Sequence, residues 1–385
     1  MVVLSLVACG CAGGAAAYTI PVPTELAFHP FDGPVPYQPR LDPIRVPPPE
    51  VRPDALLTSP VMGDPDFAAA VGKWMDYWET EAASALPVIL GRMASYEQTV
   101  DSAIAVNDLP HSLRYLPLIE SGYDPAAASR ARAVGLWQFM EPTAKEWGME
   151  VTRLLDQRRD PIRSTEAAVA FLEDLRVSFG SWFVALAAYN AGPTRVRRIL
   201  RQHAPGVEPS DSLFWSLRRR FPRETQDFLP KLVATILVAS RTAASSELAE
   251  REEPFLFDAV SVPDATTLDV VAMAAGAPLD EVVRLNPHFV RGMTPPGRPS
   301  ELRVPRGRGP TFVRNYAAIP PAERVTFVEH LVSEGETLSH IALRYGVLLA
   351  DLSAANPGLR PRYLRIGATL TVPVAPSVRG ASTGG

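Results

Sequence analysis

Cysteine is nearly absent from this 385-residue chain, because its only two cysteines, Cys9 and Cys11, stand next to the N-terminus. The rest of the chain therefore has no disulfide and no cysteine-based metal site. The six histidines are scattered and show no H-E-x-x-H or similar ligand spacing. We therefore expect no metal site and no other cofactor.

The chain also has little excess charge and no long apolar run. Its formal net charge is −4 at pH 7, so no basic surface points to nucleic acid as a partner. No segment after the N-terminus reaches the roughly 18 apolar residues of a membrane span. Hydrophobic residues make up 46% and charged residues 21%, which is typical of a globular chain that can bury a core. The length allows two or three domains.

The N-terminal segment, residues 1–20, has the pattern of a lipoprotein signal and anchor. A short apolar run ends in small residues before Cys9, as in bacterial signals whose cysteine is lipidated. A signal normally begins with positive charge, yet no Lys or Arg precedes Arg40, so we expect the true start codon to lie upstream. The alternative is an ordinary secretory signal that contains cysteines by chance.

Proline and periodicity divide the next part of the chain. Prolines recur through residues 21–65, which favours an extended tether. Residues 66–250 show apolar positions at helical spacing and predict an all-α domain. Within it, Pro110 marks the first turn of one helix, Ser164 begins another, Ser181 caps a third, and a long helix spans 224–244.

The C-terminal third contains an internal repeat. Residues 268–287 and 338–357 align without gaps, and β-like runs flank each copy. Strand, two short helices and strand form a β-α-α-β unit, so we predict small modules over 255–306 and 326–374.

The stretch from Leu116 to Ala144, LPLIESGYDPAAASRARAVGLWQFMEPTA, carries the chemistry. Glu120 follows an apolar helical run, where desolvation and the negative end of the helix dipole both raise a carboxyl pKa. A glutamic acid held neutral in this way can protonate the leaving oxygen of a glycosidic bond. The alternative is a helix-terminal Glu in a surface salt bridge. Asp124 is the nearest second carboxylate, but Asp-Pro fits the turn that ends the helix.

This stretch resembles the signature of the soluble-lytic-transglycosylase superfamily, which has a goose-lysozyme-like fold. The matching positions are the Glu120-Ser121 pair, Pro125, Ser129 and the Gly135-Leu136-Trp137-Gln138 run. The resemblance implies that Glu120 is the catalytic residue. It also implies a group of substrate-binding residues: Ser129, Gln138, Met140, Tyr189 and Asn190. The last two belong to an A-Y-N-A-G block, in which a buried core aromatic is the alternative role for Tyr189.

The resemblance further implies a mechanism with one carboxyl group. Glu120 first acts as an acid on the β-1,4 bond from N-acetylmuramic acid to N-acetylglucosamine. It then takes the proton of the C6 hydroxyl of the same muramic acid, which closes a 1,6-anhydro ring. Two positions depart from the pattern: Arg132 stands where the family usually has Gly, and Pro142 comes one place late. If the first needs a positive φ, Arg132 is strained there; otherwise it adds a cationic contact in the cleft.

The second repeat copy is similar to a LysM module, a family that binds glycans containing N-acetylglucosamine. For this copy the resemblance implies four glycan-binding residues: Gly335, Thr337, Asn356 and Pro357. The first copy has Ala265-Thr266-Thr267 in place of the Gly-Glu-Thr turn and is a degenerate form. The alternative for each copy is a packing module without a ligand.

Taken together, the chain resembles the membrane-bound lytic murein transglycosylases of type D, in which an anchored catalytic domain precedes LysM repeats. This implies a lytic transglycosylase of the bacterial cell envelope, lipid-anchored in the outer membrane and facing the periplasm. Peptidoglycan strands are the expected partner, and other cell-wall enzymes are considered as further partners. The alternatives are a hydrolytic muramidase on the same fold and a peptidoglycan-binding scaffold with weak activity.

Overall fold

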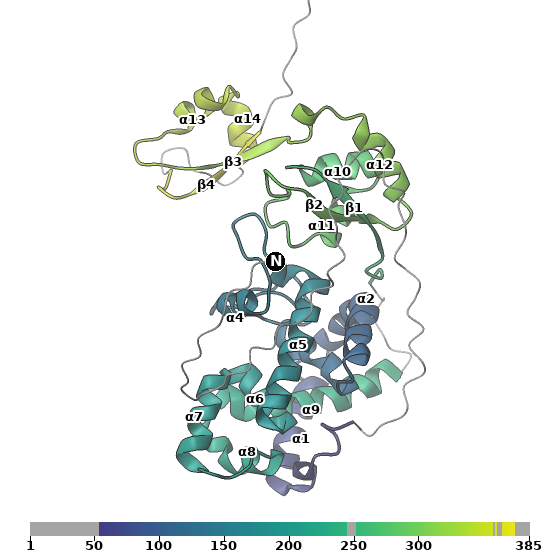
Figure 1. Ribbon diagram of the computed structural model, residues 1–385, viewed down its shortest axis with the longest axis vertical. Coiled ribbons are helices and arrows are strands. Elements are labelled where there is room, and N and C mark those ends of the chain that lie inside the picture. The colour runs from purple at the N-terminus through teal and green to yellow at the C-terminus, as the bar shows by residue number, and fades with distance from the viewer. Residues whose placement is uncertain (1–53, 245–251, 357–358, 360–363, 374–385) are drawn as a thin grey trace, which may run out of the picture. The chain divides into compact units, whose positions relative to one another are not determined.

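The computed structural model describes residues 54–244, 252–356, 359 and 364–373. Cys9, the predicted tether up to residue 53 and Pro357 lie outside these ranges. The first described segment is all helical (Figure 1). Its elements in chain order are η1 (Pro60–Gly63), α1 (Pro65–Glu79), α2 (Ala85–Val106), η2 (His111–Tyr115), α3 (Leu116–Ser121), α4 (Glu141–Glu146), η3 (Gln157–Arg159), α5 (Pro161–Phe179), α6 (Trp182–Ala191), α7 (Pro193–His203), α8 (Asp211–Leu217), η4 (Arg218–Arg220) and α9 (Arg223–Ala244).

Side-chain caps decide where several of these helices begin. Ser181 accepts a hydrogen bond from the Val184 N–H and caps α6, as its sequence position predicts. The predicted start of α5 at Ser164 is wrong. The helix begins at Pro161, because the Asp160 carboxylate accepts from the backbone N–H groups of Ile162 and Arg163. A proline at the first helical position and an acidic cap before it outweigh a hydroxyl residue further on.

The predicted helix from Pro110 is also divided. Residues His111–Tyr115 form the 3₁₀ helix η2, and the α-helical hydrogen bonds begin only at Leu116 in α3. Pro117 lies in the first turn of α3, where its missing N–H costs no intrahelical bond. The long terminal helix, by contrast, is observed as α9 over Arg223–Ala244, within one residue of the prediction.

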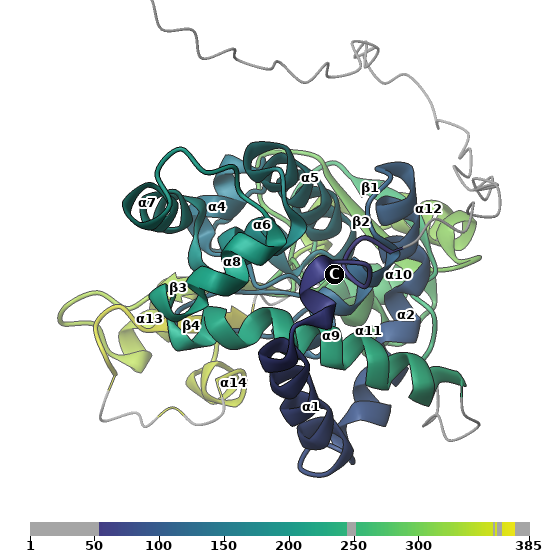
Figure 2. The same cartoon turned by 90° about the horizontal axis from the view of Figure 1, so that it is seen from below.

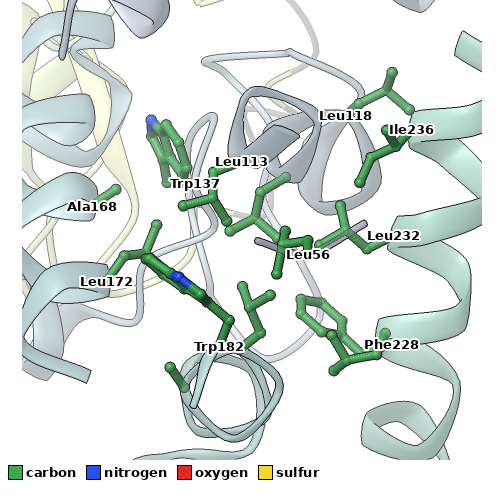
Figure 3. Packing of buried hydrophobic residues seen from close by; sticks show 14 of the residues in the cluster. Leu56, Leu113, Leu118, Trp137, Ala168, Leu172, Trp182, Phe228, Leu232 and Ile236 are labelled. Atoms are coloured by element: carbon green, nitrogen blue, oxygen red, sulfur yellow. The ribbon is translucent and has the colours of Figure 1, made fainter. Parts of the chain in front are cut away.

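One hydrophobic core joins the helices (Figure 3). α1 packs along α9, which Figure 2 shows, and α5 packs against both α2 and α6. Leu56 is only 1% exposed and lies in this core, while the Asp54 carboxylate accepts hydrogen bonds from the N–H and hydroxyl of Ser112. Residues 54–65 are therefore part of the helical domain and not of the predicted tether. Leu56 and Val61 belong to that core, and Leu57 and Met62 pack against it.

The two C-terminal modules each have the predicted β-α-α-β order. The first contains β1 (Phe257–Val262), α10 (Leu268–Ala275), α11 (Leu279–Leu285) and β2 (Ser300–Pro305). The helices α12 (Gly309–Ala317) and η5 (Pro321–Glu323) follow it, and the second contains β3 (Phe327–Leu331), α13 (Leu338–Tyr345), α14 (Leu349–Ala354) and β4 (Thr369–Pro373). In each copy the two strands pair antiparallel, with Ala259 opposite Arg303 and Glu329 opposite Thr371. Each copy has its own apolar cluster.

Across the described ranges, no helix combines the length and the apolar character needed to cross a bilayer.

Candidate active site

The short helix α3 positions Glu120. Leu116, Pro117 and Leu118 bury the first part of this helix in the domain core. Gly122 ends it in the left-handed conformation, with a φ of 61°. Glu120 thus lies in the last turn, where the unpaired carbonyl groups of a helix disfavour a nearby negative charge.

The surroundings of Glu120 keep its carboxyl group protonated. Burial raises the pKa of Glu120 to about 8; Lys231 opposes this rise and Glu224 adds to it. Within the described residues, no cation lies within ion-pair distance of the carboxyl group, so the surface salt bridge considered as an alternative is not observed. A carboxyl group with this pKa holds its proton at neutral pH and can donate it.

Lys231 of α9 is the cation whose charge bears on this carboxyl group. Its own pKa is lowered by burial, while Glu120 and Glu224 counteract that effect. Its ammonium group lies 5.4 Å from the centre of the Trp74 ring. The aromatic face provides an attraction that partly replaces water around the cation. In the sequence, Lys231 belongs to a segment that resembles the family, but the resemblance gave this residue no role in the site.

Hydrogen bonds to backbone carbonyls hold the Gly135–Phe139 run beside α3. The Ser121 hydroxyl, one residue after Glu120, donates to the Leu136 carbonyl at 2.8 Å. The Tyr189 hydroxyl donates to the Trp137 carbonyl at 2.6 Å. The Trp137 indole N–H in turn reaches the Thr165 hydroxyl at 2.9 Å. Tyr189 therefore positions this run, and its phenol does not donate to Glu120. Its ring also packs 5.5 Å from that of Phe171.

A buried arginine fastens the other side of the same run. The Arg158 guanidinium makes two hydrogen bonds to the Asp156 carboxylate, at 2.9 and 2.8 Å. A third nitrogen donates to the carbonyls of Arg132 and Phe139, at 3.0 and 3.2 Å. Arg158 thus holds both ends of the 132–139 segment, and its planar group of donors suits this task. These carbonyls lie 26 and 19 residues away in the chain, so the local sequence pattern could not predict the contacts.

The turn before this run strains Arg132, and the run itself begins at a position that requires glycine. Arg132 has a φ of 67°, so the position where the family usually has Gly does require a positive φ. A residue with a side chain adopts this conformation at a cost of about 1–2 kcal/mol. Gly135 has a φ of 87°, and a Cβ atom there would lie 1.8 Å from the Arg158 carbonyl oxygen. Only glycine fits this close approach.

Two of the predicted substrate-binding residues make local hydrogen bonds, and a third, Met140, is exposed. The Ser129 hydroxyl accepts from the Ala133 N–H at 3.0 Å and closes the turn. The Gln138 side-chain amide donates to the Gly135 carbonyl at 2.9 Å, from a backbone with a φ of 49°. Met140 is 43% exposed and precedes α4. All three lie in the loop that follows Glu120.

Asn190 links the end of α6 to the start of α9. Its side-chain oxygen accepts from the Thr225 hydroxyl at 2.7 Å, and its nitrogen donates to Glu224 at 3.3 Å. These bonds place Asn190 beside one of the two charged groups that act on Glu120. Asp124 forms a turn, as expected, because its carboxylate accepts from the Ala126 N–H at 2.8 Å.

The asparagine that occurs in both module copies, Asn286 and Asn356, has a structural role. The Asn356 nitrogen donates to the carbonyls of Leu352 and Thr371, and its oxygen accepts from the Thr371 N–H. Asn286 makes the same three bonds in the first copy, to Val282 and Arg303. Asn356 therefore ties helix to strand with both ends of its amide, which leaves it little capacity for a glycan.

The turn that precedes the first helix of each module, α10 or α13, differs between the two copies. In the second, Gly335 has a φ of 81° and Thr337 caps α13 through the His340 N–H, and both residues are exposed. In the first, Thr266 and Thr267 are fully buried. The Thr267 N–H donates to the Arg324 carbonyl at 3.0 Å. The chain's own connecting segment thus covers the turn of the first copy.

Comparison with known families agrees with this division. Residues 102–206 match the transglycosylase SLT domain, 256–321 the LysM-like domain of lytic transglycosylase MltD, and 330–373 the LysM domain. The chain therefore carries an SLT domain followed by LysM-type domains. The predicted fold class, an all-α lysozyme-like domain followed by small βααβ modules, is confirmed.

Two individual proteins are also similar to this chain in sequence. The chain is 29% identical over 295 residues to membrane-bound lytic murein transglycosylase D of Escherichia coli strain K12, covering 73% of this chain and 64% of that protein. It thus spans less than two thirds of this relative's length. A putative tributyltin chloride resistance protein of an Alteromonas species is 37% identical over 110 residues, which are 28% of this chain and 53% of that one.

Among solved structures, the 70 kDa soluble lytic transglycosylase of Escherichia coli is similar at 22% identity and a TM-score of 0.33, over 41% of this chain and 27% of that one. Lytic transglycosylase Slt of Pseudomonas aeruginosa is similar at 21% identity and a TM-score of 0.32, over 41% and 26%.

Proposed function

We propose that this protein is a peptidoglycan lytic transglycosylase in which Glu120 is the only catalytic carboxyl group. The observation that carries the proposal is the position of Glu120 in the last turn of α3, beside the Gly135–Phe139 run and within the part of the chain that matches the SLT domain. Burial at this position raises the pKa of Glu120 to about 8. The relative described as a lytic murein transglycosylase supports the substrate class.

The proposed reaction has two proton transfers. Protonated Glu120 gives its proton to the oxygen between N-acetylmuramic acid and N-acetylglucosamine, and the glycosidic bond breaks. The resulting carboxylate takes the proton of the C6 hydroxyl of the same muramic acid, whose oxygen attacks C1 and forms the 1,6-anhydro ring. Glu120 ends protonated again, and no water enters. The positive charge of Lys231 stabilises the carboxylate between the two steps.

The loop residues orient the sugar in this proposal. Ser129, Gln138 and Met140 lie along the loop, and Tyr189 and Asn190 lie at the end of α6. Tyr189 acts by holding the Trp137 carbonyl, so its role is to position the loop. Holding the loop rigid keeps the reacting atoms aligned, which is worth more than one additional contact.

The modules and the N-terminus keep the enzyme on its polymer in this proposal. The exposed turn of the second module, with Gly335 and Thr337, is the better glycan-binding surface, because the turn of the first is buried. Lipidation of Cys9, which lies outside the described residues, would anchor the protein in the outer membrane and leave the catalytic domain in the periplasm. Two attachments raise the local concentration of substrate.

Mass analysis of the products from purified sacculi tests the proposal. We expect muropeptides that end in 1,6-anhydro-N-acetylmuramic acid. Products with a reducing N-acetylmuramic acid end would show a hydrolytic muramidase instead. Sacculus binding without released products, from a protein that is folded by circular dichroism, would show a glycan-binding scaffold.

A further inference from the structure

Helix α7, Pro193–His203, presents arginines on one side and buries apolar residues on the other. Val196 and Ile199 are buried in the domain. The helix has no acidic residue, and its exposed positions include four arginines: Arg195, Arg197, Arg198 and Arg201. The chain as a whole has a net charge of −4, so this face is not a consequence of a basic composition.

These four arginines also differ from other arginines of the domain in their partners. Arg114, Arg163 and Arg218 each lie within 3.0 Å of a carboxylate. Over the part of the chain that the structure describes, no carboxylate lies within ion-pair distance of the α7 arginines. Arg197 packs over the Phe179 ring at 5.3 Å. The other three guanidinium groups keep their donors for a ligand from outside.

A hollow of about 400 Å³ opens at the first turn of α7. Two of the four arginines, Arg195 and Arg198, line it, and the rest of its wall is Ala191, Gly192, Pro193 and Thr194. Ala191 follows Asn190 in the chain, so the hollow begins at the edge of the proposed active site. Its wall combines guanidinium donors with small, mostly apolar side chains.

We infer that this hollow binds the peptide stems of the glycan strand, with Arg195 and Arg198 holding a stem carboxylate. The inference rests on the proposed function and extends it from the sugar chain to the attached peptides. Peptidoglycan stems carry free carboxylates and alanine methyl groups, which match the two kinds of surface in the hollow. A guanidinium group can bind a carboxylate through two parallel hydrogen bonds.

An anionic membrane surface fits this face less well. Helices that lie on membranes present large apolar side chains beside their basic ones. The exposed residues of α7 are instead Thr, Arg, Gln and His: Thr194, Arg195, Arg197, Arg198, Arg201, Gln202 and His203. None of them would enter the acyl region, whereas a short acidic peptide needs no such insertion.

The test compares the double variant Arg195→Gln/Arg198→Gln with the matched control Arg219→Gln/Arg220→Gln. The control removes the same charge from exposed residues that do not line the hollow. Each protein is assayed on soluble glycan strands with intact stems and on the same strands after an amidase has removed the stems. We expect the first variant to raise KM on stem-bearing strands by about 3- to 30-fold, from two exposed charge contacts, with kcat unchanged. On stem-free strands, all three proteins should be equal.

A binding measurement keeps the two proposals separate. A free tripeptide stem is titrated into each protein, and its Kd should weaken in the first variant and not in the control. Failure of the unmodified protein to bind the tripeptide, or equal KM changes in both double variants, would overturn the stem-binding site. Loss of binding to phosphatidylglycerol vesicles in the first variant, with an unchanged KM on strands, would assign the face to lipid instead. Absence of cleavage on both kinds of strand would overturn the proposed function and leave the peptide titration to decide the site.

Discussion

Glu120 and Asp160 are both shielded carboxyl groups at helix ends, and their pKa values move in opposite directions. Asp160 is only 3% exposed, and burial alone would raise its pKa, yet Arg303 and His288 hold that pKa below the usual range. Arg303 donates to both oxygens, at 2.9 and 2.8 Å. Glu120 has no such contact from Lys231, and its pKa rises to about 8.

The difference shows that burial does not by itself decide the state of a carboxyl group. Asp160 caps the N-terminal end of α5, where N–H groups and the helix dipole favour an anion. Glu120 lies in the last turn of α3, where the dipole has the opposite sign. The first site therefore stabilises a carboxylate and contributes to structure. The second favours a protonated acid, which is the form that the proposed reaction requires.

Removing the structural carboxylate should have the largest effect on stability. Asp160→Ala leaves Arg303 without its partner and removes the cap of α5, so we expect a loss of about 3–5 kcal/mol in the free energy of unfolding. Urea unfolding at pH 7 measures it. The control is Asp66→Ala, because Asp66 is 73% exposed in its pair with Arg218 and such pairs contribute under about 1 kcal/mol.

The pH dependence of this effect has a defined sign. Because the folded pKa of Asp160 is lowered, its contribution is present above its unfolded pKa, near 4, and is lost as the pH falls through the folded value. The difference between wild type and Asp160→Ala should therefore shrink in acid. A difference that stays constant down to pH 2 would contradict the role of the ionised group.

Neutralising the proposed catalytic carboxyl group, Glu120, should change the free energy of unfolding by less and in the opposite direction. The raised pKa of Glu120 means that its favourable contribution is present below about 4.5 and is lost as the pH rises towards 8. Glu120→Gln should therefore gain about 1–3 kcal/mol at pH 9 and nothing at pH 4. Thermal unfolding across this pH range measures it. A variant that is less stable than wild type at pH 9 would show that the carboxylate has a favourable partner.

The smallest expected effect on the free energy of unfolding comes from a substitution in the loop between Glu120 and Asp160. Glycine adopts the φ of 67° at position 132 without strain, so Arg132→Gly removes the strain of the arginine. The greater entropy of glycine in the unfolded chain cancels part of this gain in stability. We expect a net increase of about 0.5–1 kcal/mol in the free energy of unfolding. Arg130→Gly, a change at an exposed neighbour with no positive φ, should destabilise instead. If both variants behave alike, the strain argument for Arg132 does not hold.

Local sequence patterns predicted the elements of this fold well. The cap at Ser181, the helix over 224–244 and both β-α-α-β units follow from periodicity and turn chemistry within a few residues. Contacts between distant residues could not be predicted in this way. Tyr189 reaches the Trp137 carbonyl 52 residues away, and Lys231 acts on Glu120 from another helix.

The same limit applies to one domain boundary and to one residue of the second module. Residues 54–65 have the prolines of a tether, but only the folded core shows that Leu56 fills a place in it. Asn356 matches a glycan-binding family position, yet its amide is used by its own module. A sequence shows which residues can bind a ligand, and the structure shows which of them are already engaged.

The turnover of Glu120→Gln tests the central claim most directly. The variant keeps the size of the side chain and removes both the proton that is given and the base that receives one. We expect release of anhydro-muropeptides from sacculi to fall by about 10²–10⁴-fold at least, in a protein that still binds sacculi and melts no lower than wild type. Wild-type kcat/KM should also decline as the pH rises through about 8. Retained activity in the folded variant would contradict the account, and Asp124 would then be the next carboxyl group to replace.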